Sequence, residues 1–231
     1  MKDGPLAIYT EIPTVCRLLG DLGGKTALDV ACGTGYYTRL LSNLGAERVR
    51  GVDLSPAMIA AARREEVACP RGIKYYVADA ADLPGLGTFD LVTAIFLFNY
   101  ASDLKTLRRM CQNIAINLTH GGRLIAIAPN PDFVSGQDDT APYLFKTKVL
   151  NSEADGSRMR LDFLMDPPFS IEYWQWSRAV YEEALSRCGF ERISWIPFEV
   201  APEGVARHGQ NFWRAFRRNP PNIALTAQRS R

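Results

Sequence analysis

The sequence predicts an α/β protein with a mostly parallel β-sheet that is covered by helices on both faces. Two observations predict this fold. Short, continuously apolar runs alternate along the chain with amphipathic segments, which is the order of strands and helices in parallel sheets. The 231 residues are 47% hydrophobic and 23% charged, a composition with which one large domain can bury a core. We therefore expect a single domain over residues 1–231.

The first part of the chain supplies five strands and the helices between them. Apolar residues at helical spacing over Ile12–Leu19 predict a leading helix. The predicted strands are Ala27–Val30, Arg48–Val52, Ile73–Val77, Phe89–Ala94 and Arg123–Ala128. Helix-capping residues predict two further helices, Tyr36–Leu44 and one that runs from Ser55-Pro56 to Val67. Apolar residues at helical spacing predict a third helix from Leu104 to Leu118.

Segment 130–176 breaks this alternation. Apolar and polar residues alternate over 159–163 and again over 169–176, which predicts strands. We expect a β insertion here that covers the substrate. The rest of the chain predicts a helix Arg178–Arg187 capped by Ser177, a strand Ile193–Val200, a helical stretch Gly204–Arg218 and a final strand Ile223–Ala227.

The composition argues against several functional classes. With 27 basic and 25 acidic residues, the net charge of +2 is too balanced for a general nucleic-acid-binding protein. The five cysteines lack metal-ligand spacing, so we expect reduced thiols, no metal site and a cytoplasmic protein. There is no signal-peptide pattern and no apolar run near the ~18 residues of a membrane span.

The loop Gly33-Thr34-Gly35 lies between a predicted strand and a predicted helix, where backbone N–H groups can receive a ligand. A dinucleotide-binding loop expects a third glycine where this chain has Thr38. Asp29 would repel a pyrophosphate, but it would face the ammonium of a ligand that also carries a carboxylate. Cys32 lies in the loop, but His120 and His208 are the only histidines to serve as its base, so we do not expect a nucleophile.

Two further acids follow the next two predicted strands. Asp53 is placed to bind ribose hydroxyls, and Asp79 to accept from an adenine amino group while the Ala80 N–H meets a ring nitrogen. Met58 is a candidate to lie over the adenine face. Because ligands bind beyond the carboxyl ends of parallel strands, we expect these groups in one crevice.

Five ordered motifs carry a family resemblance: Leu28–Gly35, Gly51–Ser55, Val77–Ala80, Phe89–Val92 and Leu118–Leu124. Over nearly its whole length the chain resembles a class I S-adenosylmethionine-dependent methyltransferase. The resemblance implies a Rossmann-like seven-stranded sheet with one antiparallel strand near the end, and the cofactor S-adenosyl-L-methionine, with S-adenosyl-L-homocysteine as product. Similar enzymes close an additional leading helix and a tyrosine over the cofactor, and Tyr9 is the tyrosine of this chain that lies near that position in the sequence. The expected cofactor residues are Tyr9, Asp29, Ala31, Gly33, Thr34, Gly35, Asp53, Leu54, Met58, Asp79, Ala80 and Ile95.

Leu97–Ala101, Tyr173–Ser177 and Asn211–Trp213 resemble a bacterial group that acts on small molecules and includes toxoflavin-type azapteridine N-methyltransferases. We expect a small, flat, aromatic or heterocyclic acceptor, with catalysis mainly by proximity and orientation. The expected substrate residues are Phe96, Asn99, Tyr100, Tyr143, Trp174 and Trp176. Tyr100 and His208 are the candidates for a general base.

Two other functional classes stay open at this point. A non-catalytic S-adenosylmethionine-binding protein would share the loop and the acids, and a nicotinamide oxidoreductase would share the first strand and loop. The run Asp166–Phe169 resembles the motif with which nucleic-acid methyltransferases hold a flipped base, but it lies past the fifth strand, so a turn is expected. We expect a small-molecule acceptor and neither nucleic-acid nor membrane partners; the oligomeric state is open.

Overall fold

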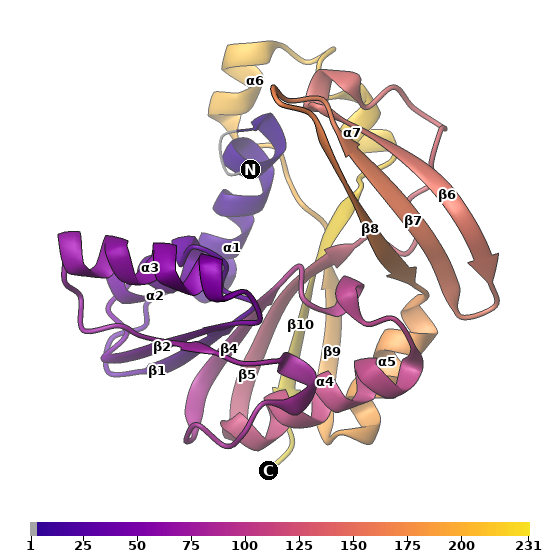
Figure 1. The fold of residues 1–231 in the computed structure, drawn as a ribbon. Coiled ribbons are helices and arrows are strands. Elements are labelled where there is room, and N and C mark those ends of the chain that lie inside the picture. Colours follow the sequence, from indigo (N-terminus) through magenta and orange to yellow (C-terminus); the bar gives the residue numbers. More distant parts are fainter. Residues whose placement is uncertain (1–3) are drawn as a thin grey trace.

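The computed structural model describes residues 4–231, and a mixed β-sheet forms its centre (Figure 1). Its strands are β1 (Thr26–Val30), β2 (Arg48–Asp53), β3 (Lys74–Val77), β4 (Phe89–Ile95), β5 (Leu118–Pro129), β9 (Phe190–Ile196) and β10 (Asn222–Arg229). The seven strands are ordered β3-β2-β1-β4-β5-β10-β9. The first five pair in parallel, and β10 runs antiparallel to both of its neighbours. The predicted fold class and its one antiparallel strand are therefore confirmed.

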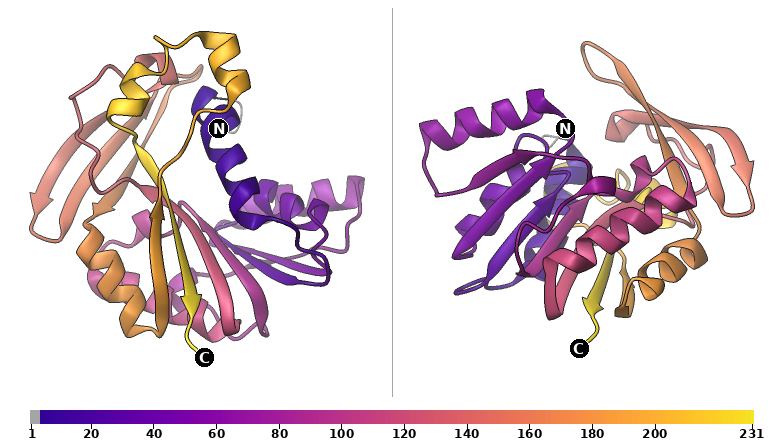
Figure 2. Two further views of the ribbon diagram at one scale, coloured as in Figure 1. Left: turned by 180° about the vertical axis from the view of Figure 1, so that it is seen from behind. Right: turned by 60° about the horizontal axis from the view of Figure 1, so that its bottom comes forward.

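Helices cover both faces of this sheet (Figure 2). One face carries α1 (Ile12–Leu19), α2 (Tyr36–Asn43) and α3 (Pro56–Ala68), which bury Val15, Leu41 and Ile59 in one apolar core. The other face carries α4 (Leu104–Asn117) and α5 (Arg178–Arg187), which bury Leu107 and Tyr181 in a second core. Residues 4–231 contain no helix that is both long enough and apolar enough to cross a bilayer.

The helices α3, α4 and α5 begin where the sequence placed them, and each has a side-chain cap. The Ser55 hydroxyl accepts a hydrogen bond from the Met58 N–H, and Ser177 does the same for Val180. Asp103 caps α4 through the Thr106 N–H at 2.7 Å. These caps satisfy N–H groups that have no partner inside the helix.

The insertion forms a second, three-stranded antiparallel sheet of β6 (Phe145–Glu153), β7 (Gly156–Phe163) and β8 (Phe169–Trp176). The alternating patterns predicted β7 and β8, whereas β6 was missed because most of its side chains are exposed and it shows no clear alternation. Asp166–Phe169 lies at the turn between β7 and β8, as expected, and its Asp166–Pro167 peptide is cis.

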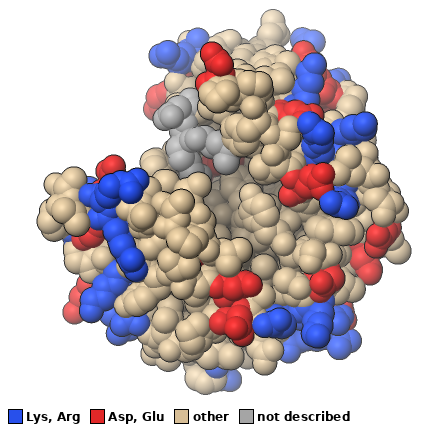
Figure 3. Space-filling model, in the orientation of Figure 1, with Lys and Arg blue, Asp and Glu red and all other residues tan. Residues whose placement is uncertain are grey.

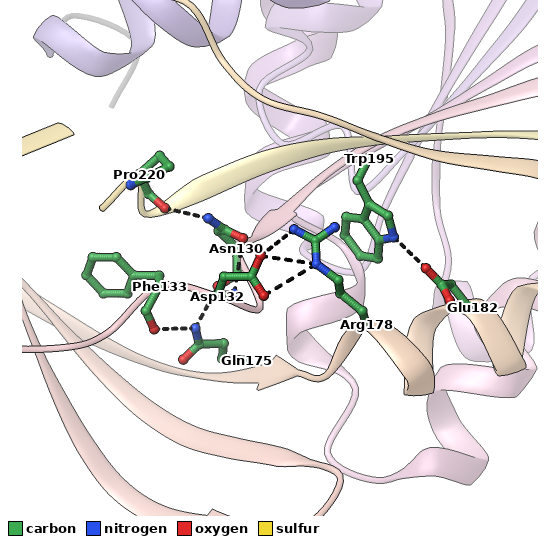
Figure 4. Close-up of polar contacts among 8 residues, drawn as sticks. All are labelled: Asn130, Asp132, Phe133, Gln175, Arg178, Glu182, Trp195 and Pro220. Carbon is green, nitrogen blue, oxygen red and sulfur yellow. Dashed lines mark hydrogen bonds and ion pairs between the residues drawn. The ribbon is translucent and has the colours of Figure 1, made fainter. Parts of the chain in front are cut away.

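Side-chain contacts attach this second sheet to the first (Figure 4). The Gln175 amide on β8 donates to the carbonyl oxygens of Asn130, at 2.6 Å, and Phe133, at 2.9 Å. Asn130 follows β5 and donates in turn to the Pro220 carbonyl. Nearby, Arg178 forms an ion pair with Asp132 and lies over the Trp195 ring. Gln175 thus couples the end of β8 to the loop that leaves β5.

Four predicted boundaries were wrong. Strand β5 begins at Leu118, well before the predicted start at Arg123. The strand expected over 193–200 is β9, which begins earlier and ends before Pro197, since proline has no N–H for the sheet. The single helix expected over 204–218 is two helices, α6 (Pro202–His208) and α7 (Arg214–Arg218), because Gly209 takes a φ of 78°. The leading helix also continues upstream as a π-helical turn, η1 (Ala7–Glu11), which carries Tyr9.

Candidate functional site

The glycine loop leaves β1 through three residues with positive φ, namely Ala31, Gly33 and Gly35. A Cβ atom on Gly35 would lie 2.6 Å from the Tyr75 hydroxyl, so both the backbone conformation and the available space require glycine. Two loop N–H groups are already bonded within the protein: Gly33 donates to Asp53 and Gly35 to the Cys32 carbonyl. The expectation of a loop with free N–H groups is therefore wrong for these two donors.

Asp29 lies beneath the loop and is 1% exposed. Its two carboxylate oxygens accept hydrogen bonds from the hydroxyls of Thr38 and Thr93, each at 2.7 Å. Thr38 lies at the position where a dinucleotide-binding loop would have glycine. Its hydroxyl fixes the orientation of Asp29. A role for Asp29 toward a ligand ammonium stays a prediction.

Asp53, at the end of β2, accepts hydrogen bonds from three parts of the crevice. One oxygen of Asp53 accepts from the Gly33 N–H at 2.8 Å and the other from the Ser55 N–H at 2.9 Å. The Asp53 carbonyl accepts from Ala78, which follows β3. Asp53 is therefore held between the glycine loop, α3 and the end of β3.

Exposed apolar side chains surround this fixed acid. Leu54 is 67% exposed and Met58 44%, and Val77, which the sequence analysis missed, is 47% exposed at the end of β3. On the same side, Asp79 caps the 3₁₀ turn η2 (Ala80–Asp82) by accepting from the Ala81 N–H at 2.8 Å. Exposed apolar surface beside two carboxylates has the chemistry that a nucleoside needs, and the residues fit S-adenosylmethionine.

The end of β4 forms the other side of the crevice. Phe96, directly after Ile95, has a φ of 57°, which is strained for a residue with a bulky side chain, and its N–H donates to the Ile127 carbonyl. The 3₁₀ turn η3 (Phe98–Tyr100) follows, with Asn99 buried and Tyr100 exposed. Figure 3 shows a central hollow that is bordered mainly by uncharged residues.

The two candidates for a general base are poorly suited to that role. Partial desolvation of the phenol, and to a lesser extent the Asp53 carboxylate, raise the pKa of Tyr100, so its phenol stays protonated at neutral pH although the residue is partly exposed. His208 is stacked on Phe212, with ring centroids 4.5 Å apart, and its ring meets that of Tyr9 edge-on. His208 therefore belongs to an aromatic cluster between η1 and α6.

Two of the expected substrate residues are packing residues. The hydroxyl of Tyr143 donates to the Phe212 carbonyl and accepts from the Phe216 N–H, and the residue is 6% exposed. Trp176 is buried in the core of the α4–α5 face and stacks on Trp174 with centroids 4.9 Å apart. Trp174 is half-buried and remains the tryptophan that reaches a cavity.

That open cavity has a volume of about 380 Å³ and lies between η3 and the β7–β8 hairpin. Asn99, Tyr100 and Ser102 line one side, and Arg158, Glu172 and Trp174 line the other. The sequence analysis missed Ser102, Arg158 and Glu172. The alternating sequence pattern predicted that Arg158 and Glu172 lie on the polar face of their strands. Only the pairing register of β7 and β8 and the docking of this hairpin show that the polar face lies toward η3.

The environment of Cys32 disfavours a nucleophilic role for its thiol. Burial and the carboxylates of Asp29 and Asp53 raise the pKa of the Cys32 thiol well above its usual range, which suppresses a thiolate. Within residues 4–231, no group of three or more His, Cys, Asp or Glu side chains is placed to hold a metal ion.

Comparison with known proteins identifies the family. Residues 27–122 match the family described as a methyltransferase domain. An uncharacterized protein of Haemophilus influenzae is 35% identical over 139 residues, which cover 57% of this chain but only 53% of that protein. The demethylmenaquinone methyltransferase of Tropheryma whipplei is 31% identical over 190 residues, which cover 78% of this chain and 72% of that enzyme.

A solved structure shares the fold. The S-adenosylmethionine-dependent methyltransferase of Mesorhizobium loti superposes with a TM-score of 0.68 at 21% identity, and the match covers 99% of both chains. Together with the similarity to the Tropheryma enzyme and the methyltransferase-domain match, this shows that the chain belongs to the class I S-adenosylmethionine-dependent methyltransferases.

Proposed function

We propose that the protein transfers the methyl group of S-adenosylmethionine to a small, flat, aromatic or heterocyclic molecule. The observation that carries the proposal is the cavity between η3 and the β7–β8 hairpin. Tyr100 lines this cavity and follows β4, whose carboxyl end lies at the same edge of the sheet as Asp53 at the end of β2. This placement supports an acceptor cavity next to the proposed cofactor crevice.

The residues around the crevice suggest how the ribose and the adenine of the cofactor are held. In this proposal Asp53 binds the ribose hydroxyls, and Leu54, Met58 and Val77 offer apolar surface to the adenine. Tyr9, Ala31, Thr34, Ala80 and Ile95 complete the proposed set. When bound, the cofactor supplies a methyl group that its sulfonium already activates.

The task of the chain is then to align the acceptor and exclude water. Correct alignment of two reactants is worth roughly 7–11 kcal/mol of the barrier. Trp174 and Tyr100 offer aromatic surface to a flat ring, and the protonated Tyr100 phenol can donate a hydrogen bond to the acceptor.

We propose an intracellular, cytoplasmic site of action, which the five free cysteines support.

Calorimetry with S-adenosylhomocysteine, followed by an acceptor screen with labelled S-adenosylmethionine, tests the proposal. The screen should contain quinols, because one relative is named for demethylmenaquinone, and azapteridine-like heterocycles, because of the sequence resemblance. We expect binding and transfer to at least one of these classes. Binding without transfer to any acceptor would support a non-catalytic binding protein, and no binding would overturn the proposal.

A further inference from the structure

Asn99 is the buried polar group at the cavity that the fold leaves unused. It is 3% exposed, and among residues 4–231 its Oδ1 atom has no hydrogen-bond partner. A buried acceptor without a partner destabilises a protein, so native structures seldom keep one without a reason. Because Asn99 lines the cavity, a turn of its side chain toward the cavity would let a ligand group there satisfy its amide.

The opposite wall of the cavity presents charge in a balanced form. Arg158 on β7 forms an ion pair with Glu172 on β8, and both side chains line the cavity and are about half exposed. A ligand carboxylate would compete with Glu172 for Arg158, and a ligand ammonium would compete with Arg158 for Glu172. An uncharged polar group leaves the ion pair intact.

The amide of Asn99 also restricts the shape of that group. It carries a donor and an acceptor side by side in one plane, which pairs with a ligand edge that has an acceptor next to a donor. A cyclic amide, with its N–H beside its carbonyl, has such an edge. Tyr100, Tyr173 and Trp174 offer aromatic surface around it.

We propose that the cavity selects acceptors with an uncharged cyclic-amide edge and that Asn99 pairs with this edge. The inference rests on the proposed function and narrows its acceptor class. Asn99 is then a specificity-determining residue, with the Arg158–Glu172 pair excluding charged analogues. Phenolic acceptors such as quinols would bind less well, because a lone hydroxyl makes only one of the two hydrogen bonds.

Matched bicyclic probes test the inference by calorimetry on protein saturated with S-adenosylhomocysteine. 2-Quinolone has the cyclic-amide edge, N-methyl-2-quinolone has its N–H blocked, and quinoline and 1-naphthol have no amide. We expect 2-quinolone to bind about tenfold more tightly than the other three, as two well-aligned hydrogen bonds would allow. Equal binding of all four, tighter binding of 1-naphthol, or no binding of any would overturn the inference.

A variant separates the role of Asn99 in binding from a structural role. Asn99→Leu keeps the number of side-chain heavy atoms and removes the unpaired polar group, so we expect an unchanged or higher melting temperature together with loss of the preference for 2-quinolone. Asn151→Leu, on exposed β6 outside the cavity lining, is the control and should keep the preference. A retained preference in Asn99→Leu, or a large loss of stability, would overturn the assignment.

The same experiments distinguish this inference from the proposed function. Asn99→Leu should bind S-adenosylhomocysteine as the wild-type protein does, since the residue lies on the acceptor side. If the wild-type protein does not bind S-adenosylhomocysteine, the proposed function fails. If it binds but shows no preference for the cyclic amide, the narrower inference alone fails.

Discussion

At the scale of single residues, the site depends on acids whose orientations are fixed before any ligand arrives. Asp29 is held by two threonine hydroxyls and Asp53 by two backbone N–H groups. Such preorganisation reduces the cost of ordering the site on binding. Each acid also stabilises the glycine loop or the helix after it, in addition to any contact with a ligand. The effect of a substitution should therefore be measured on both the affinity for the cofactor and the stability of the protein.

The first prediction concerns Asp53. Replacing it with alanine removes the proposed hydrogen bonds to the ribose and leaves the Gly33 N–H without its partner. Hydrogen bonds to a charged group contribute about 1.5–3 kcal/mol, so S-adenosylhomocysteine should bind roughly 10- to 150-fold more weakly in calorimetry.

Asp90→Asn is the control for that experiment. Hydrogen bonds from Thr26 hold the pKa of Asp90 below its usual range, and this acid begins β4 at the opposite edge of the sheet. The control should therefore lose some stability above pH 4 and keep its affinity. Wild-type affinity in Asp53→Ala would contradict the role of Asp53.

The second prediction concerns thiol reactivity. Because burial and two nearby carboxylates raise the pKa of Cys32, it should react with iodoacetamide far more slowly than the exposed Cys69 at pH 8. Peptide mass spectrometry after timed labelling measures both rates, and unfolded protein, in which both should react, is the control. Equal rates in the folded protein would show that Cys32 is accessible and ionised.

At the scale of elements, the N-terminal and C-terminal helices meet above the crevice. The Tyr9 carbonyl on η1 accepts from the Ala201 N–H at the start of α6, at 2.8 Å. Gly204 permits this contact, since a Cβ atom there would lie 2.7 Å from the Tyr9 Cβ. Figure 2 shows from behind that the N-terminal helix lies next to α6, so segments far apart in sequence join here.

The third prediction follows from that contact. Gly204→Ala should push η1 away from α6, which costs about 1–3 kcal/mol of stability as an overpacked site does and weakens S-adenosylhomocysteine binding through Tyr9. Thermal unfolding and calorimetry measure the two effects. Gly85→Ala meets no atom within 4 Å and should leave both unchanged. An unaffected Gly204→Ala would refute the proposed link between this helix contact and the cofactor.

At the scale of the whole molecule, the proposed cofactor crevice and the proposed acceptor cavity involve two sheets. The seven-stranded sheet presents the carboxyl ends of β1 to β4, and the β6–β8 sheet lies beside it (Figure 1). The β6–β8 sheet supplies Arg158, Glu172 and Trp174 to the cavity. The hydrogen bonds of Gln175 hold the β6–β8 sheet to the loop that follows β5. They therefore fix the distance between the two sheets.

The fourth prediction concerns global stability. A ligand present at 100 times its Kd stabilises the folded state by about 2.7 kcal/mol, so S-adenosylhomocysteine should raise the melting temperature by roughly 5–11 °C for a chain of this size. NAD at equal concentration should produce no shift. A shift with NAD and none with S-adenosylhomocysteine would instead favour a nicotinamide-binding function.

Much of the fold followed from local signals. Caps at Ser55 and Ser177 and the apolar runs of the parallel strands placed most elements within a few residues. The exposed strand β6 and the break at Gly209 escaped detection, because neither has a strong local pattern. The crevice was predictable as well, since parallel strands bring their carboxyl ends to one edge, and Gly33, Asp53 and Asp79 follow such ends.

By itself, the sequence determined the order of most strands and helices, the glycine loop and the acids of the proposed cofactor crevice. These depend on periodicity, caps and chain direction, which are properties of neighbouring residues. Only the tertiary structure decided that Thr38 orients Asp29, that Tyr143 and His208 belong to an aromatic cluster, and that Arg158 and Glu172 face Asn99. These contacts join residues far apart along the chain, and they exist only because strand register and the docking of one element on another bring the side chains together.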